Sequence, residues 1–75
     1  MTTYKAIFGS DSTVEYSFDG AKAWVAQMAG RTMRWAVASD GHCWYGYRSA
    51  SEKSIGGATG DGSIARIVSH THPDF

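Results

Sequence analysis

Residues 32–48, TMRWAVASDGHCWYGYR, decide the fold. Two runs rich in aromatic and β-branched residues flank the dipeptide Asp40-Gly41. This dipeptide is favoured in two-residue type I′ turns, because such a turn needs a positive φ at both central residues. The stretch therefore predicts a tight antiparallel β-hairpin.

The register of this hairpin follows from pairing Ser39 with His42 across the turn. Side chains alternate between the two faces of a strand, so this pairing places the tryptophans on one face and the tyrosines on the other. Trp35 then lies opposite Gly46, and a tryptophan over a cross-strand glycine is a known stabilising arrangement. We expect the core on the face that carries Met33, Trp35, Val37, Trp44 and Gly46.

The opposite face of the hairpin mixes small and aromatic residues with one cation. It carries Arg34, Ala36, Ala38, Cys43, Tyr45 and Tyr47. Tyrosine and arginine are enriched at protein interfaces, which favours a partner-binding surface. The alternative is that a helix or a second copy of the chain covers this face, because periodicity alone does not show which face is inside.

The segment before the hairpin predicts two strands and a helix. Residues 3–8 and 14–18 alternate between apolar and polar side chains around turn residues at 9–12, which predicts a second hairpin. A helix is expected from an N-cap at Asp19 to a left-handed C-terminal glycine at Gly30. Its apolar stripe, expected in the core, is Ala21, Trp24, Val25 and Met28.

The segment after the hairpin is rich in glycine and serine. Residues 49–63 have the composition of a flexible loop, which is either a binding loop or mobile. Residues 64–68 could form a last strand. The whole pattern predicts one α+β domain over residues 1–75, with an antiparallel sheet of four to five strands (ββαββ and a C-terminal strand) packed on one helix.

Net charge, cysteine content and hydropathy limit the classes of function that the chain can have. Seven Lys and Arg balance seven Asp and Glu, so bulk charge does not predict nucleic-acid binding, which relies on an excess of cations against phosphates. The single cysteine, Cys43, excludes an intramolecular disulfide, so large aromatic core residues or a homodimer must stabilise so short a chain. No apolar stretch approaches the ~20 residues of a membrane span, and we expect a cytoplasmic location.

The tail HTHPDF at residues 70–75 carries a candidate metal site. On a strand, His70 and His72 would point the same way, and Asp74 with His42 or Cys43 could complete the ligands. His-x-His-x-Asp resembles the start of the metallo-β-lactamase motif, and His-Thr-His-Pro resembles the metal-binding core of JAMM-type metalloproteases. The chain departs from both, because the former needs a further histidine and the latter a downstream Ser and Asp. An ordinary polar tail is the other interpretation.

No other string completes a catalytic or cofactor motif. Residues 57–63 have the glycine spacing of a phosphate-binding loop but lack its lysine. Cys43 has no base beside it, since adjacent strand residues such as His42 point to opposite faces. Glu15 and Glu52 are the only glutamates, and nothing pairs them as acid and base. We therefore expect a protein without enzymatic activity and without a cofactor.

In size and organisation the chain resembles the small inhibitors encoded by phages and mobile elements, including anti-CRISPR proteins. The resemblance implies a protein that sterically blocks a host-defence complex, with a protein or nucleoprotein as its partner. The surface expected to bind that partner comprises Arg34, Tyr45, Tyr47, Arg48 and the segment 51–61, within which we single out Glu52, Lys53 and Asp61.

Two alternatives remain open. The first is a single-stranded nucleic-acid-binding module in which Tyr45, Tyr47 and Arg34 contact bases on the sheet. The second is a small metal-binding protein that uses the C-terminal His-x-His.

Overall fold

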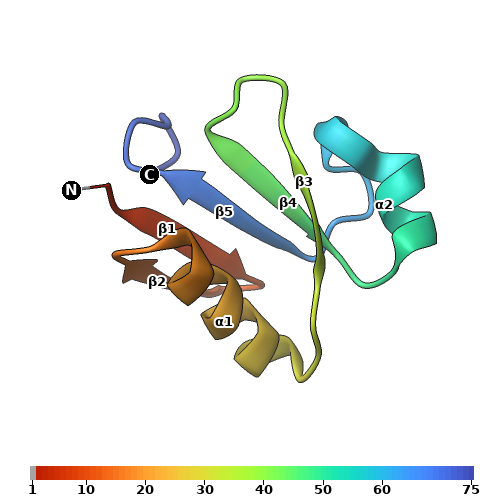
Figure 1. Cartoon of the computed structure of the whole chain (residues 1–75), viewed down its shortest axis with the longest axis horizontal. Coiled ribbons are helices and arrows are strands. Elements are labelled where there is room, and N and C mark those ends of the chain that lie inside the picture. The colour runs from red at the N-terminus through yellow and green to blue at the C-terminus, as the bar shows by residue number, and fades with distance from the viewer. Residues whose placement is uncertain (1) are drawn as a thin grey trace.

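The computed structural model describes residues 2–75 and shows a five-stranded antiparallel sheet with two helices (Figure 1). The strands lie in the order β2-β1-β5-β4-β3. The α+β class predicted from the sequence is confirmed, and the C-terminal strand is the central one. The elements are β1 (Tyr4–Phe8), β2 (Asp11–Glu15), α1 (Phe18–Ala29), β3 (Arg34–Val37), β4 (Cys43–Tyr47), α2 (Ala50–Gly56), the 3₁₀ turn η1 (Gly57–Thr59) and β5 (Ala65–Ser69).

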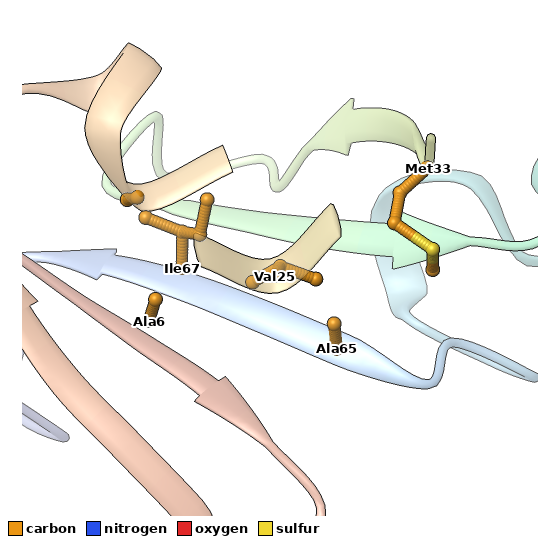
Figure 2. Close-up of a cluster of buried hydrophobic side chains, with 6 residues drawn as sticks. Ala6, Val25, Met33, Ala65 and Ile67 are labelled. Carbon is orange, nitrogen blue, oxygen red and sulfur yellow. The ribbon is translucent and has the colours of Figure 1, made fainter. Parts of the chain in front are cut away.

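The main core lies between α1 and one face of the sheet. Figure 2 shows Val25 of α1 above β5, which contributes Ala65 and Ile67, with Ala6 of β1 beside them. Burying such side chains stabilises a fold by ~1.5–3 kcal/mol for each large aliphatic residue. Partly buried aromatic residues surround this cluster, namely Tyr4, Phe8, Phe18, Trp24, Trp35 and Trp44.

The predicted register of the β3–β4 hairpin is confirmed. Val37 pairs with Trp44 and Trp35 with Gly46, so both tryptophans contact the α1 side of the sheet. Val37 itself is exposed, because α1 does not extend over the end of this edge strand.

The type I′ turn predicted for Asp40-Gly41 is wrong. Only Gly41 has a positive φ, and its N–H donates to the carbonyl of Ala38 at 3.0 Å. Asp40 instead uses its carboxylate to accept a hydrogen bond from the backbone N–H of His42 at 2.9 Å. The loop is therefore longer than two residues, and the register survives because Ala38 still pairs with Cys43.

The N-terminal hairpin is tighter than predicted. Strand β2 begins at Asp11, because Gly9 takes a φ of 62° and turns the chain within two residues.

The predicted N-cap of the helix is also wrong: Ser17, not Asp19, caps α1 by accepting from the N–H of Gly20 at 2.9 Å. The helix ends at a left-handed Gly30, as expected.

The predicted core stripe of α1 is confirmed in part. Ala21 and Val25 are buried and Trp24 packs at the edge of the core, but Met28 is exposed near the end of the helix. In residues 2–75, no helix has the length and apolar character needed to cross a membrane.

The largest difference from the sequence prediction concerns residues 49–63. Instead of a flexible loop they form α2 and η1, which cover the face of the sheet opposite α1. Ser49 caps α2 by accepting from the N–H of Glu52 at 3.2 Å. Ser49-x-x-Glu52 has the sequence pattern of a capping box, a helix-start signal that the glycines further along obscure, although the Glu52 carboxylate accepts from the Ser49 hydroxyl at 3.4 Å.

Candidate functional site

The tyrosine face that was predicted to bind a partner is largely inside the molecule. Tyr47 is 0% exposed, and its hydroxyl donates to the carbonyl of Gly57 at 2.6 Å. Burial raises the pKa of its phenol, and the nearby Asp61 carboxylate raises it further. Tyr47 is therefore a neutral core residue that fastens the α2–η1 segment, and its assignment to a partner surface is wrong.

Tyr45 lies under the same cover. A Cβ built on Gly60 would be 2.7 Å from its ring, so the chain passes directly over the tyrosine and only glycine fits there, at a φ of 82°. Burial is also the main cause that raises the pKa of Tyr45. Tyr45 is half-buried, so the cover leaves only part of this residue available to a partner.

The remaining predicted residues lie at the surface, on the cover or on the strands beside it. Arg48 donates to a Glu52 carboxylate oxygen at 2.9 Å, which links the end of β4 to the first turn of α2. Arg34 and Lys53 are exposed, as is Asp61 in the loop after η1. Arg34 and Arg48 line one groove and Glu52 and Asp61 line one pocket, so the Arg48–Glu52 pair joins four of the seven predicted site residues into one region of the surface. Lys53 is two positions before Ile55 on α2 and so lies on another side of the helix.

Sequence reasoning missed the most exposed apolar residue of this region. Ile55 is 84% exposed on α2, three positions after Glu52 and so on the same side of the helix. A shallow pocket lies beside it, lined by Glu52, Ile55, Asp61 and Gly62. The signal was present, because Ile55 is a single large aliphatic residue in an otherwise polar helix. We call the set Arg34, Arg48, Glu52, Ile55 and Asp61 the α2 surface.

The Arg48–Glu52 pair gives the α2 surface a pH dependence. The hydrogen bond from Arg48 holds the pKa of Glu52 below its usual value of 4.5. A carboxyl whose pKa is lower in the folded state stabilises the fold above its unfolded pKa, and this contribution is lost as pH falls through the folded pKa.

We therefore expect Glu52→Gln to be less stable than wild type at neutral pH and equal to it at a pH below the folded pKa of Glu52. Urea unfolding at both pH values measures this. A stability difference that stays constant with pH would show that the ionised pair contributes nothing.

The C-terminal histidines do not form the predicted His-x-His pair. Strand β5 ends at Ser69, so His70 and His72 lie in turns rather than on a strand. His70 is exposed, whereas the His72 ring lies 3.6 Å from a carboxylate oxygen of Asp40 and accepts from the N–H of Asp74 at 3.0 Å. Across the described residues 2–75, no group of three His, Cys, Asp or Glu is placed to hold a metal ion.

The tail has a structural role instead. Asp74 pairs with Arg66 of β5 at 2.9 Å, and Lys5 of β1 approaches the carbonyl of Phe75 at 3.5 Å. These contacts hold residues 70–75 against the α2 side of the sheet, where Val68 and Cys43 are fully buried.

Cys43 and His42 are not arranged as a nucleophile and its base. Burial raises the pKa of the Cys43 thiol, which favours its unreactive neutral form. The His42 ring is at the surface, with Nδ1 3.4 Å from the Thr71 hydroxyl and 3.5 Å from that of Ser69. No carboxylate of residues 2–75 pairs with this ring, so the described contacts do not assemble a catalytic triad.

Comparison with known proteins adds no relative. The chain matches no protein-family model, no curated protein and no solved structure.

Proposed function

We propose that this protein is a non-enzymatic binding protein that inhibits a macromolecular complex by covering part of its surface. Its partner is a protein or nucleoprotein assembly of the kind that small phage-encoded inhibitors, including anti-CRISPR proteins, block. The α2 surface makes the contact.

The observation that carries this proposal is the exposure of Ile55. A large aliphatic side chain that is 84% exposed contributes little to the fold of the free chain. On a surface ringed by charged residues it fits the anatomy of an interface, in which an apolar anchor is surrounded by a polar rim. Arg48, Glu52 and Asp61 supply that rim.

The rigidity of the support favours the same conclusion. The α2 surface rests on Tyr47, whose ring and hydroxyl are held in the fold, so Ile55 is presented from an ordered helix rather than from a mobile loop. A preorganised surface loses less conformational entropy on binding.

The test is capture of the partner with the tagged full chain from a lysate of its host cells. Wild type is compared with Ile55→Asp and with Val14→Asp, which places the same charge on an exposed valine of β2 at the far edge of the sheet. We expect wild type and Val14→Asp to retain the same complex and Ile55→Asp to recover it at least about tenfold less, as for an interface hot spot.

The captured complex must also lose activity when the free protein is added, because occlusion is the proposed mechanism. Equal recovery by Ile55→Asp, or a captured complex that keeps its full activity, would contradict the proposal. Loss of capture after nuclease treatment, with free oligonucleotide bound by the pure chain, would assign the protein to nucleic-acid binding instead.

A further inference from the structure

A groove lined by three arginines adjoins the α2 surface. It has a volume of about 430 Å³ and lies where the connection from α1 to β3 meets the residues that join β4 to α2. Its charged lining is Arg31, Arg34 and Arg48, with Thr32, Met33 and Ser49 between them. Three of the seven cationic side chains of a chain with zero net charge therefore surround one groove.

Two of these charges are not neutralised within the fold. Arg48 is paired with Glu52, whereas Arg31 and Arg34 form no ion pair with any carboxylate in residues 2–75. Arg31 is held in place by donating to the carbonyl of Arg48 at 3.0 Å. The groove therefore has an excess of about two positive charges and suits an anionic ligand, which guanidinium groups bind through paired N–H donors.

An apolar hollow continues this groove. Its volume is about 260 Å³, and its lining includes Ala23 and Ala26 of α1 together with Trp35, with Lys22 at the same hollow. It shares Thr32 and Met33 with the arginine groove, so the two are contiguous. A ligand that fills both parts must carry negative charge and an apolar group side by side.

We propose that the two hollows form a binding site for an acidic segment of a protein partner, with an apolar side chain of that segment seated against Trp35. The inference rests on the proposed function, because it names the chemistry that the inhibitor recognises on its target. Arg31 and Arg34 bind the carboxylates, and the apolar side chain lies between Ala23, Ala26 and Trp35.

A protein segment fits better than a nucleic acid for two reasons. The chain has zero net charge, so a nucleic acid that extends beyond the groove finds no excess of cations for its other phosphates. The Trp35 ring packs one face against Gly46, where a Cβ would be 3.0 Å from the ring, and it shares the hollow with Ala23 and Ala26, whose methyl groups suit an aliphatic side chain. A short acidic segment with one apolar side chain needs only the arginines and this hollow.

The probe is a five-residue peptide of four glutamates around a central leucine, compared with the same peptide carrying serine at the centre. Binding is followed through the amide and arginine Nε–H resonances of the labelled full chain. We expect the leucine peptide to bind more tightly, shifting the resonances of Arg31, Arg34 and the Trp35 indole. Arg34→Glu should weaken it about tenfold or more, as for loss of a close charge pair.

Lys5→Glu is the matched control, because it makes the same change in charge on β1, outside both hollows. It should bind the leucine peptide as wild type does. Equal affinity for the two peptides, equal weakening by Lys5→Glu, or tighter binding of oligothymidylate at the same resonances would each overturn the inference. None of these results would change the outcome of the capture experiment with Ile55→Asp. The peptide site can therefore be disproved while the proposed function is retained.

Discussion

Tyr47→Ala is expected to unfold the protein or leave it barely folded. Replacing a fully buried aromatic residue by alanine costs ~3–5 kcal/mol, and a domain of this size has only about that much net stability. Tyr47 is 0% exposed and contacts both Gly56 and Gly57 of the cover. Circular dichroism and urea unfolding measure the loss, and a variant within about 1 kcal/mol of wild type would show that the cover is not seated on this ring.

Tyr47→Phe separates the hydroxyl from the ring. It removes only the hydrogen bond to the Gly57 carbonyl and should cost about 1–2 kcal/mol, since that carbonyl loses its donor. The ratio of the losses of unfolding free energy in Tyr47→Phe and Tyr47→Ala therefore shows how much of the stabilisation by Tyr47 comes from packing of its ring. A phenylalanine variant as unstable as the alanine variant would contradict the packing account.

Gly56→Ala is expected to destabilise the protein, although alanine has a higher helix propensity than glycine. Gly56 has helical angles, φ −79° and ψ −43°, at which alanine would normally be favoured by about 1 kcal/mol. An added Cβ would overlap the carbonyl oxygen of Asp61 and lie 2.6 Å from the Tyr47 ring. Overpacking of this kind costs ~1–3 kcal/mol and sometimes more, and here the backbone itself must move.

Ser54→Ala is the control for this substitution. Ser54 is exposed in the same helix, so alanine there should change stability by no more than about 0.5 kcal/mol. Urea unfolding of both variants gives the comparison. A Gly56→Ala variant as stable as Ser54→Ala would mean that α2 does not pack on Tyr47.

The central hairpin could be predicted from sequence because its information is local. The alternation of Trp35 and Val37 against Trp44 and Gly46 defines one register, and a slip by one residue would move the tryptophan of the shifted strand to the other face. The sequence determined the type of turn less well than it determined the register. Asp40 can use its side chain to bond to the His42 N–H, which replaces the strained φ that a type I′ turn would demand of it.

The candidate site could be predicted only in part, because its arrangement depends on packing between distant segments. Alternation placed Tyr45 and Tyr47 on one face, but it could not show that Gly56 and Gly60 would lie against their rings. Glycines in that segment indicate flexibility by composition, yet in the structure they permit close approach. The Ser49-x-x-Glu52 box was the available sign of a helix, and Ile55 follows from that helix.

Residues 50–60 form an ordered cover seated on Tyr47, from which Ile55 faces outward. Nuclear Overhauser contacts in the labelled wild-type chain measure this arrangement. We expect strong contacts between the Tyr47 ring protons and the α protons of Gly56 and Gly57, with none from the Tyr47 ring to the Ile55 methyl groups. Sharp, averaged signals for residues 50–60 without any contact to Tyr47 would contradict it.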